Sequence, residues 1–286
     1  MAARTTKQDW ERGWTLGPEG PWATAQLDPR PPCALCAGSG RREVEVEGVR
    51  RFGRCRCQIL PDRAAIWNAA RVPARHVHCT MDSFETRDPT RAGAEGGSAG
   101  AWSEVRRWLD DYRPGQDNRS IVLYGETGRG KTHLAVAACR ELVFRHGVGV
   151  RFIEFTHLLS DIREGIGRGD PAATTLTPFI QPPVLIVDEL GKGRNTEWEV
   201  SILDEIVSRR YNARGALFGT TNFKPKAPAG ADPNRARTYG DGVPLASMYL
   251  SERLGERAFS RLLETVTFVP ALGDDHRLRL AANSRR

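Results

Sequence analysis

The sequence predicts an α/β protein in which a parallel sheet carries helices on both faces and follows a small metal-binding module. Three observations support this fold class. A glycine-rich loop of the G-x-x-x-x-G-K-[ST] type stands between a short apolar run and a helical pattern, at residues 125–132. A nearly continuous apolar run over residues 184–187 ends in two carboxylates. Four cysteines form two close pairs near the N-terminus.

Length and composition set the broad class of protein. The chain has 286 residues, 40% of them hydrophobic, which is enough for one domain of ordinary size and a smaller one. No apolar run is long enough to span a bilayer, and residues 1–22 mix charges with tryptophans and lack the apolar centre of a secretory signal. We therefore expect no membrane partner and a cytoplasmic protein whose thiols stay reduced.

The formal net charge of +7 is distributed unevenly. Residues 1–80 contain 13 Lys and Arg against 8 Asp and Glu, so the basic excess lies mainly in the N-terminal part. This excess fits an acidic partner, such as nucleic acid or an acidic protein face. A solvated basic surface fits the charge equally well. Residues 1–32 are polar and contain three tryptophans, so we expect a flexible arm. The sequence leaves open whether this arm docks through its tryptophan rings.

Four cysteines predict a structural zinc site: Cys33, Cys36, Cys55 and Cys57. Tetrahedral Zn²⁺ takes four thiolates delivered in two close pairs by two tight turns, and a G-x-G sequence after the first pair permits such a turn. Residues 42–52 alternate as in a small hairpin that carries one pair toward the other. The second pair has one intervening residue instead of the usual two. Disulfides, which the cytoplasm disfavours, and four unrelated thiols are the alternatives.

Periodicity and breaker residues predict the other elements. Helices are expected over residues 61–72, 101–112, 133–146, 156–166, 198–211 and 247–263, strands over 121–123, 150–155, 184–187, 215–221 and 265–269, and loops over 87–100, 167–183 and 224–246. A second metal site at His76, His78 and Cys79 is disfavoured, because the four cysteines already complete one.

The loop after the first of these strands is predicted to bind the phosphates of a nucleoside triphosphate. Its glycines let successive backbone N–H groups point at phosphate oxygens, and the N-terminus of the next helix adds to this attraction. Lys131 is expected to reach the β- and γ-phosphates, and the Thr132 hydroxyl to hold Mg²⁺. The expected nucleotide-binding residues are Gly125, Glu126, Thr127, Gly128, Arg129, Gly130, Lys131 and Thr132. A glycine turn with a chance lysine is the alternative.

Two carboxylates follow the apolar run of residues 184–187, which suits a central strand buried on both faces. Ligands bind at the carboxyl ends of such strands, so Asp188 is expected to bind Mg²⁺ and Glu189 to polarise the attacking water. Asn222, at the end of another predicted strand, is expected to orient that water or to sense the γ-phosphate. The absence of a nearby Gln or His favours hydrolysis over a kinase transfer. Two solvated acids at a strand end are the alternative.

Several segments resemble the AAA+ ATPases of the DnaC/DnaI-type bacterial replicative helicase loaders and of their relatives, the IstB-type transposition helpers. The matching segments occur in family order at residues 125–135, 186–191, 206–211, 220–222 and 254–262. The resemblance implies an AAA+ P-loop ATPase domain with strand order 5-1-4-3-2 over residues 76–286. The flexible arm (1–32) and a zinc-binding module with a linker helix (33–75) would precede it.

Carried over residue by residue, the resemblance gives roles to polar residues of the ATPase domain. Asn222 resembles the sensor-1 residue. Arg261 resembles the arginine finger that enters the site of a neighbouring subunit, with Arg257 as the alternative, and Arg277 resembles a sensor-2 arginine. A guanidinium in the finger position would neutralise the charge that develops on the γ-phosphoryl group. Without the resemblance, each arginine also fits a surface salt bridge.

The resemblance also implies a function. It implies an ATP-hydrolysing loader with ATP, Mg²⁺ and Zn²⁺ as cofactors, which self-associates, binds single-stranded DNA and docks on a hexameric replicative helicase through its N-terminal module. Some loaders have such a zinc module, whereas others have a helical N-domain without these cysteines. The alternatives are an IstB-type helper that binds duplex DNA and a transposase, and a nucleotide-dependent adaptor without DNA contact. The pair Asp188 and Glu189 argues against an inactive ATPase.

Overall fold

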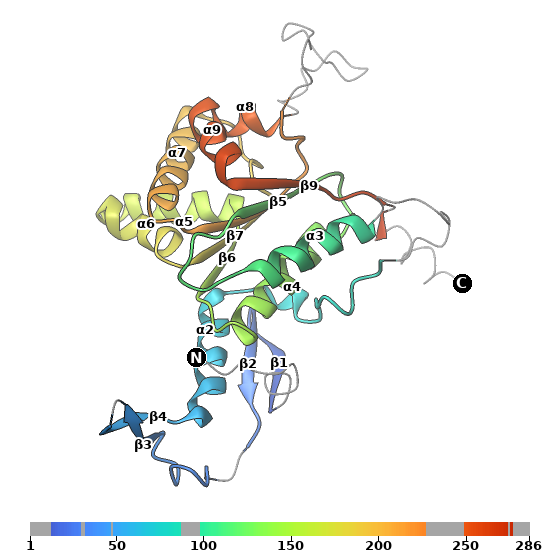
Figure 1. Cartoon of the computed structure of the whole chain (residues 1–286). Coiled ribbons are helices and arrows are strands. Elements are labelled where there is room, and N and C mark those ends of the chain that lie inside the picture. The colour runs from blue at the N-terminus through green and yellow to red at the C-terminus, as the bar shows by residue number, and fades with distance from the viewer. Residues whose placement is uncertain are drawn as a thin grey trace, which may run out of the picture.

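The computed structural model describes residues 13–29, 32–46, 48–86, 98–226, 249–273 and 275–276. These residues form a five-stranded sheet flanked by helices and two antiparallel two-stranded ribbons (Figure 1). None of the described helices is long and apolar enough to cross a bilayer.

The central sheet has the strand order β6-β7-β8-β5-β9. Its members are β5 (Ser120–Tyr124), β6 (Val150–Glu154), β7 (Val184–Asp188), β8 (Ala216–Thr221) and β9 (Val266–Pro270). All neighbouring strands in this sheet run parallel. Numbered along the chain and read from β9, the order is 5-1-4-3-2, so the predicted AAA+ P-loop topology is confirmed.

Helices cover both faces of this sheet, because successive strand residues point to opposite sides. On β5, Ile121 and Leu123 belong to one hydrophobic core and Val122 to the other. The first core includes side chains of α3 (Ser98–Asp111) and α4 (Lys131–Phe144). The second core includes side chains of α5 (Phe155–Gly167), α6 (Ala172–Ile180), α7 (Glu197–Asn212), α8 (Leu250–Leu254) and α9 (Glu256–Thr265).

Two expected elements in this domain are wrong. The loop expected over residues 167–183 contains α6, which forms because Leu176 and Phe179 are buried in the second core in spite of Pro178 inside the helix. The single helix expected over residues 247–263 is divided into α8 and α9 at Gly255, whose φ of 77° no α-helix accommodates. The connector expected over 87–100 and the loop expected over 224–246 lie mostly outside the described residues.

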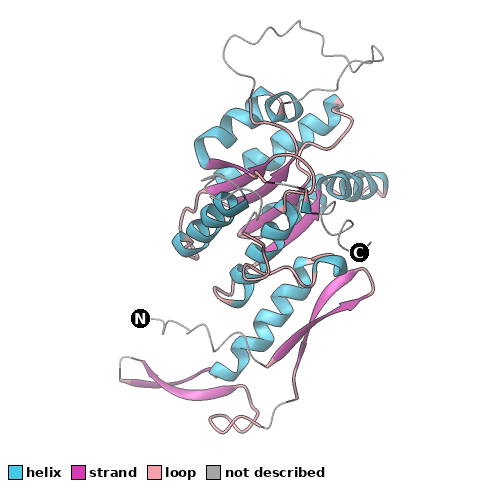
Figure 2. Ribbon diagram, turned by 90° about the vertical axis from the view of Figure 1, so that its right-hand side faces the viewer, coloured by secondary structure: helices cyan, strands magenta, loops and turns pink. Residues whose placement is uncertain are grey.

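The N-terminal part contains two hairpins and a helix (Figure 2). The first hairpin pairs β1 (Trp14–Glu19) with β2 (Trp22–Leu27), the second pairs β3 (Arg41–Val46) with β4 (Val49–Arg54), and α2 (Ile59–Ala70) follows after a short 3₁₀ turn (Arg56–Gln58). A second 3₁₀ turn (Ala74–His76) leads toward α3. Figure 2 shows the β3–β4 ribbon near one end of α2, away from the central sheet.

The first hairpin differs from the flexible arm expected over residues 1–32. Trp14 is buried, and its ring stacks on Phe144 at the end of α4 with 3.8 Å between the ring centroids. The indole of Trp67 on α2 donates a hydrogen bond to the carbonyl of Ala23 at 2.8 Å. Residues 14–27 are therefore ordered by contacts with α4 and α2. No local pattern in the sequence predicts these contacts. Residues 1–12 lie outside the described part.

Candidate nucleotide site and cysteine cluster

The loop between β5 and α4 has a backbone that only glycine can adopt at two critical points. Gly125 has a φ of 149°, and a Cβ there would lie 2.5 Å from the carbonyl oxygen of Ala271. Gly130 has a φ of 78°, and a Cβ there would lie 2.5 Å from the ring of Phe84. The loop is therefore closely surrounded, and its shape is set by the protein before any phosphate binds.

Lys131 and Thr132 begin α4 directly after this loop. The buried ammonium of Lys131 donates hydrogen bonds to the carbonyls of Gly125 and Glu126, at 2.8 and 2.7 Å. Its charge thus stands inside the loop, where the predicted phosphates would lie. The hydroxyl of Thr132 donates to the carboxylate of Asp188, with oxygen separations of 2.9 and 3.2 Å.

Asp188 ends β7 and is only 4% exposed. The hydroxyl of Thr220 on β8 donates to this carboxylate at 2.5 Å. Burial raises the pKa of Asp188, and the hydroxyls of Thr220 and Thr132 partly oppose that rise. A buried carboxylate beside a hydroxyl is an all-oxygen donor set, which is the set that Mg²⁺ prefers. The structure thus brings together Thr132 and Asp188, the two predicted magnesium ligands, and they fit the ion.

Glu189 follows Asp188 in a strained backbone conformation. Its φ is +56°, which is uncommon for a residue with a side chain. Its N–H donates to the hydroxyl of Thr220 at 3.0 Å, and its carboxylate forms an ion pair with Lys192. The hydrogen bond with Glu189 raises the pKa of Lys192. Such strain concentrates at functional sites, and Glu189 lines the cavity beside the phosphate loop.

Asn222 lies just beyond the end of β8, next to the same loop. Its side-chain amide donates a long hydrogen bond, 3.4 Å, to the hydroxyl of Thr127. This contact joins Asn222 to the phosphate loop. Glu126 and Arg129, also in the loop, form an ion pair of 2.6 Å with each other.

One cavity of about 480 Å³ lies beside the phosphate loop. Its lining includes residues 127–132, Glu189 and Asn222, which the sequence predicts for a nucleotide site, and Thr220, which it does not. The predicted residues Gly125, Glu126 and Asp188 are not part of the lining. The lining also includes residues that sequence reasoning missed: Arg75, His76, Cys79, Ser83, Phe84, Glu85, Ser98, His133, Leu272, Gly273, Asp275 and His276. The cavity is large enough for a small-molecule ligand.

Tertiary contacts with α4 position this additional wall. The ring Nε2–H of His133 donates a 2.8 Å hydrogen bond to the carbonyl of Thr80, and the ring meets that of Phe84 edge-on, with centroids 5.3 Å apart. At the other side, the N–H of His276 donates to the carbonyl of Gly128 at 3.1 Å. Residues 75–84 show no periodicity, so only their position before the strand and helix of the phosphate loop could have indicated this role.

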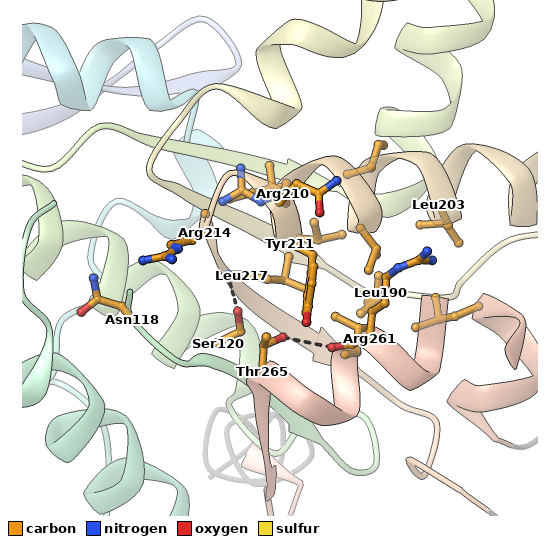
Figure 3. A pocket seen from close by; sticks show the side chains of 18 of the residues that line it. Asn118, Ser120, Leu190, Leu203, Arg210, Tyr211, Arg214, Leu217, Arg261 and Thr265 are labelled. Atoms are coloured by element: carbon orange, nitrogen blue, oxygen red, sulfur yellow. Dashed lines mark hydrogen bonds between the residues drawn. The ribbon is translucent and has the colours of Figure 1, made fainter. Parts of the chain in front are cut away.

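The predicted finger arginines lie away from this cavity. Arg261 donates to Asp204 of α7 at 2.8 Å, and its side chain is 30% exposed. Arg257, one turn earlier on α9, is 79% exposed, with its Nε 4.0 Å from Asp204. Figure 3 shows Arg261 beside Tyr211 in the wall of a second cavity, of about 400 Å³, which contains no residue of the phosphate loop. Arg277 lies outside the described residues.

The four N-terminal cysteines converge as the sequence predicts. The sulfurs of Cys33 and Cys55 lie 3.8 Å apart, those of Cys36 and Cys57 lie 3.6 Å apart, and all four lie within 4.8 Å of one another. Zn–S bonds of about 2.3 Å in a tetrahedron place sulfurs about 3.8 Å apart, so the cluster fits Zn²⁺. Within the described residues no such cluster includes His76, His78 or Cys79.

Comparison with known proteins agrees with this geometry. The model of the family of IstB-like ATP binding proteins matches residues 112–225. The replicative helicase loader DnaC of Escherichia coli (strain K12) is 26% identical over 157 residues, which are 54% of this chain and 60% of the loader. This match thus spans less than two thirds of the loader's length.

A second relative comes from Mycobacterium tuberculosis (strain ATCC 25618 / H37Rv). This relative, Rv3427c, is named as an ATP-binding protein in an insertion sequence, and it is 28% identical over 211 residues, 73% of this chain and 75% of that protein. The crystal structure of the DnaC helicase loader matches with a TM-score of 0.53 and 22% identity, over 68% of this chain and 98% of that chain. This last likeness shows the shared fold.

Proposed function

We propose that this chain, which carries an IstB/DnaC-like ATP-binding domain with the AAA+ fold, is an ATP-hydrolysing helicase loader of the bacterial cytoplasm. In this role the chain binds ATP and Mg²⁺, contacts single-stranded DNA and helps to place a hexameric replicative helicase on it. The observation that carries the nucleotide part is the convergence of Lys131, Thr132 and Asp188 on the loop at the carboxyl edge of the sheet.

Each of these residues has a distinct role in hydrolysis. Lys131 offsets phosphate charge in the ground state, and the Thr132 hydroxyl and Asp188 carboxylate hold Mg²⁺, which supplies further neutralisation of the β- and γ-phosphates. Glu189 lines the cavity and accepts a proton from the attacking water. Asn222 reaches the loop through Thr127 and orients that water or senses the γ-phosphate.

The catalytic set is completed by a neighbouring copy of the chain. Neither Arg257 nor Arg261 lines the nucleotide cavity of its own chain, so either can act only in trans. The resemblance of residues 254–262 to the loaders favours Arg261, which must leave Asp204 to do so, whereas Arg257 is already exposed. Arg277 acts as a sensor-2 arginine in this proposal.

Arg261→Ala is expected to lower turnover about 10³-fold with little change in ATP affinity, because a finger acts on the transition state. Arg257→Ala is the matched control on the same helix. Mixing Arg261→Ala with Lys131→Ala subunits should restore part of the activity, since some interfaces then combine an intact loop with an intact finger. The reverse pattern of loss and recovery would assign the finger to Arg257.

The N-terminal module provides the helicase contact in this proposal. The cysteine cluster holds one structural Zn²⁺ and orders the basic β3–β4 ribbon, where Arg41, Arg42, Arg50, Arg51 and Arg54 are exposed. The DnaC match supports a loader, and the insertion-sequence relative equally supports an IstB-type helper of a transposase as the second candidate.

Tagged chains expressed in the native cell test the function and separate the two candidates. Glu189→Gln should bind ATP normally and hydrolyse it at least tenfold more slowly, because the amide cannot accept the proton. It should therefore retain the replicative helicase better than the Lys131→Ala chain, which cannot bind ATP. Recovery of a transposase instead of the helicase would favour the helper, and wild-type hydrolysis by Glu189→Gln would refute the role of Glu189.

A further inference from the structure

The lytic carboxylate proposed above is held by a lysine three residues later in the chain. Lys192 donates through its ammonium to the carboxylate of Glu189, and its backbone N–H donates to the carbonyl of Glu189 at 3.0 Å. The second bond closes a tight turn. Residues 189–192 therefore present a carboxylate and an ammonium side by side.

This turn is anchored on β8. The N–H of Leu190 donates to the carbonyl of Thr220 at 2.7 Å, and the hydroxyl of Thr221 donates to the carbonyl of Leu190 at 2.8 Å. Together with the bond from the N–H of Glu189 to Thr220, these contacts fix the backbone on both sides of the Glu189 side chain. The carboxylate can thus change its position only by rotation of the side chain.

The turn is also clamped by α8. The guanidinium of Arg253 donates to the carbonyl of Gly193 at 3.0 Å. Gly191 has a φ of 83°, and a Cβ there would lie 3.1 Å from Leu250 and 3.2 Å from Arg253. Because the turn cannot shift as a body, the ion pair with Lys192 decides where the carboxylate rests.

The two partners differ in their surroundings. Glu189 lines the nucleotide cavity, whereas Lys192 does not and its side chain is 57% exposed. The ammonium hydrogen-bonds one of the two carboxylate oxygens, Oε2, and thereby holds the direction in which the carboxylate rests. An ion pair this exposed is weak, so its effect on the rate of hydrolysis is modest.

We propose that Lys192 is a positioning residue that restrains Glu189 at rest and thereby lowers the basal rate of ATP hydrolysis. This inference rests on the proposed ATPase function and adds a restraint on its basal rate.

Lys192→Met tests the restraint in the full-length chain. The basal turnover should rise about two- to fivefold, the size expected for the loss of one exposed ion pair, while ATP affinity stays unchanged. Lys192→Arg should keep the low rate, because the guanidinium can restore the pair. Arg209→Met, which removes an exposed pair with Glu205 on α7, is the matched control and should leave turnover unchanged.

The double variant Glu189→Gln with Lys192→Met separates this inference from the function beneath it. If Lys192 acts through Glu189, the double variant should turn over as slowly as Glu189→Gln alone. An unchanged or lower rate in Lys192→Met, or a gain that persists in the double variant, overturns the restraint. A rate that Glu189→Gln does not lower refutes the proposed base itself.

Discussion

The nucleotide site and the cysteine cluster are both formed by residues that sequence motifs indicate, but they are supported in different ways. Lys131 and Asp188 are buried at the edge of a five-stranded sheet with a hydrophobic core on each face. The cysteines stand beside a two-stranded ribbon on which Phe52 is 75% exposed and Val49 is also exposed. The comparison teaches that the first site is shaped by the protein, whereas the second depends on its ligand, since an isolated hairpin is only marginally stable.

Removal of metal should have the largest effect and should affect only one of the two regions. Structural zinc contributes about 10 kcal/mol or more of apparent binding free energy, and the ribbon has little else to hold it. A chelator or Cys36→Ser should therefore disorder residues 33–57 while the chain still binds ATP. Hydrogen exchange by mass spectrometry and a nucleotide-binding assay on the same sample measure the two regions separately.

Metal analysis is the control for that experiment, and one zinc per chain is expected before chelation. Protected amides over residues 33–57 in a metal-free chain would contradict the dependence on zinc. A parallel loss of ATP binding would show that the two regions are not separable.

Local patterns explain which parts of both regions could be predicted. The strand, the glycine loop and the helix of residues 120–144 are adjacent in sequence, so the motif identifies them together. Asp188 joins Thr132 because a parallel sheet brings the carboxyl ends of its strands to one edge, and the sheet order was implied by the resemblance. The two cysteine pairs converge because the hairpin between them is short.

What could not be predicted depends on contacts between distant parts of the chain. Trp14 is buried because Phe144 lies beneath it, 130 positions further along the sequence. The wall of the cavity at Phe84 depends on His133 of α4. α6 forms over a proline-rich segment because the second core accepts Leu176 and Phe179. In each case tertiary packing overrides local propensity.

The contact between Trp14 and Phe144 sharpens the comparison, because it joins the N-terminal part to the helix that follows the phosphate loop. Trp14→Ala is expected to lower the free energy of unfolding by about 3 kcal/mol, the usual effect of removing a buried aromatic ring. Trp22→Ala, at a ring that is 39% exposed on the same hairpin, should have a clearly smaller effect. Urea denaturation of the two variants measures the difference, and equal losses would mean that the stacking on α4 contributes little.

The smallest effect is expected at the same junction and depends on pH. His146 lies just after α4, and its ring packs against Tyr112. Its Nε2 is buried and has no hydrogen-bond partner among the described residues. Burial, followed by the charges of Arg145, Arg113 and Arg63, lowers the pKa of His146 to about 4, and Asp110 opposes this shift.

The sign of the pH effect follows from this lowered pKa. An unfolded chain takes up a proton at His146 below about pH 6.5, whereas the folded chain resists it until about pH 4. The folded state is therefore fully stable with respect to this group above about pH 6.5 and loses stability as the pH falls toward about 4. Between about pH 7 and pH 5 the loss should be about 2 kcal/mol. His146→Leu should remove that part of the acid sensitivity, and His78→Leu, at an exposed histidine, should leave it in place. Urea denaturation of the wild-type chain and the two variants at both pH values measures how much free energy of unfolding each chain loses. If His146→Leu loses as much as the wild-type chain, the acid sensitivity does not come from protonation of His146.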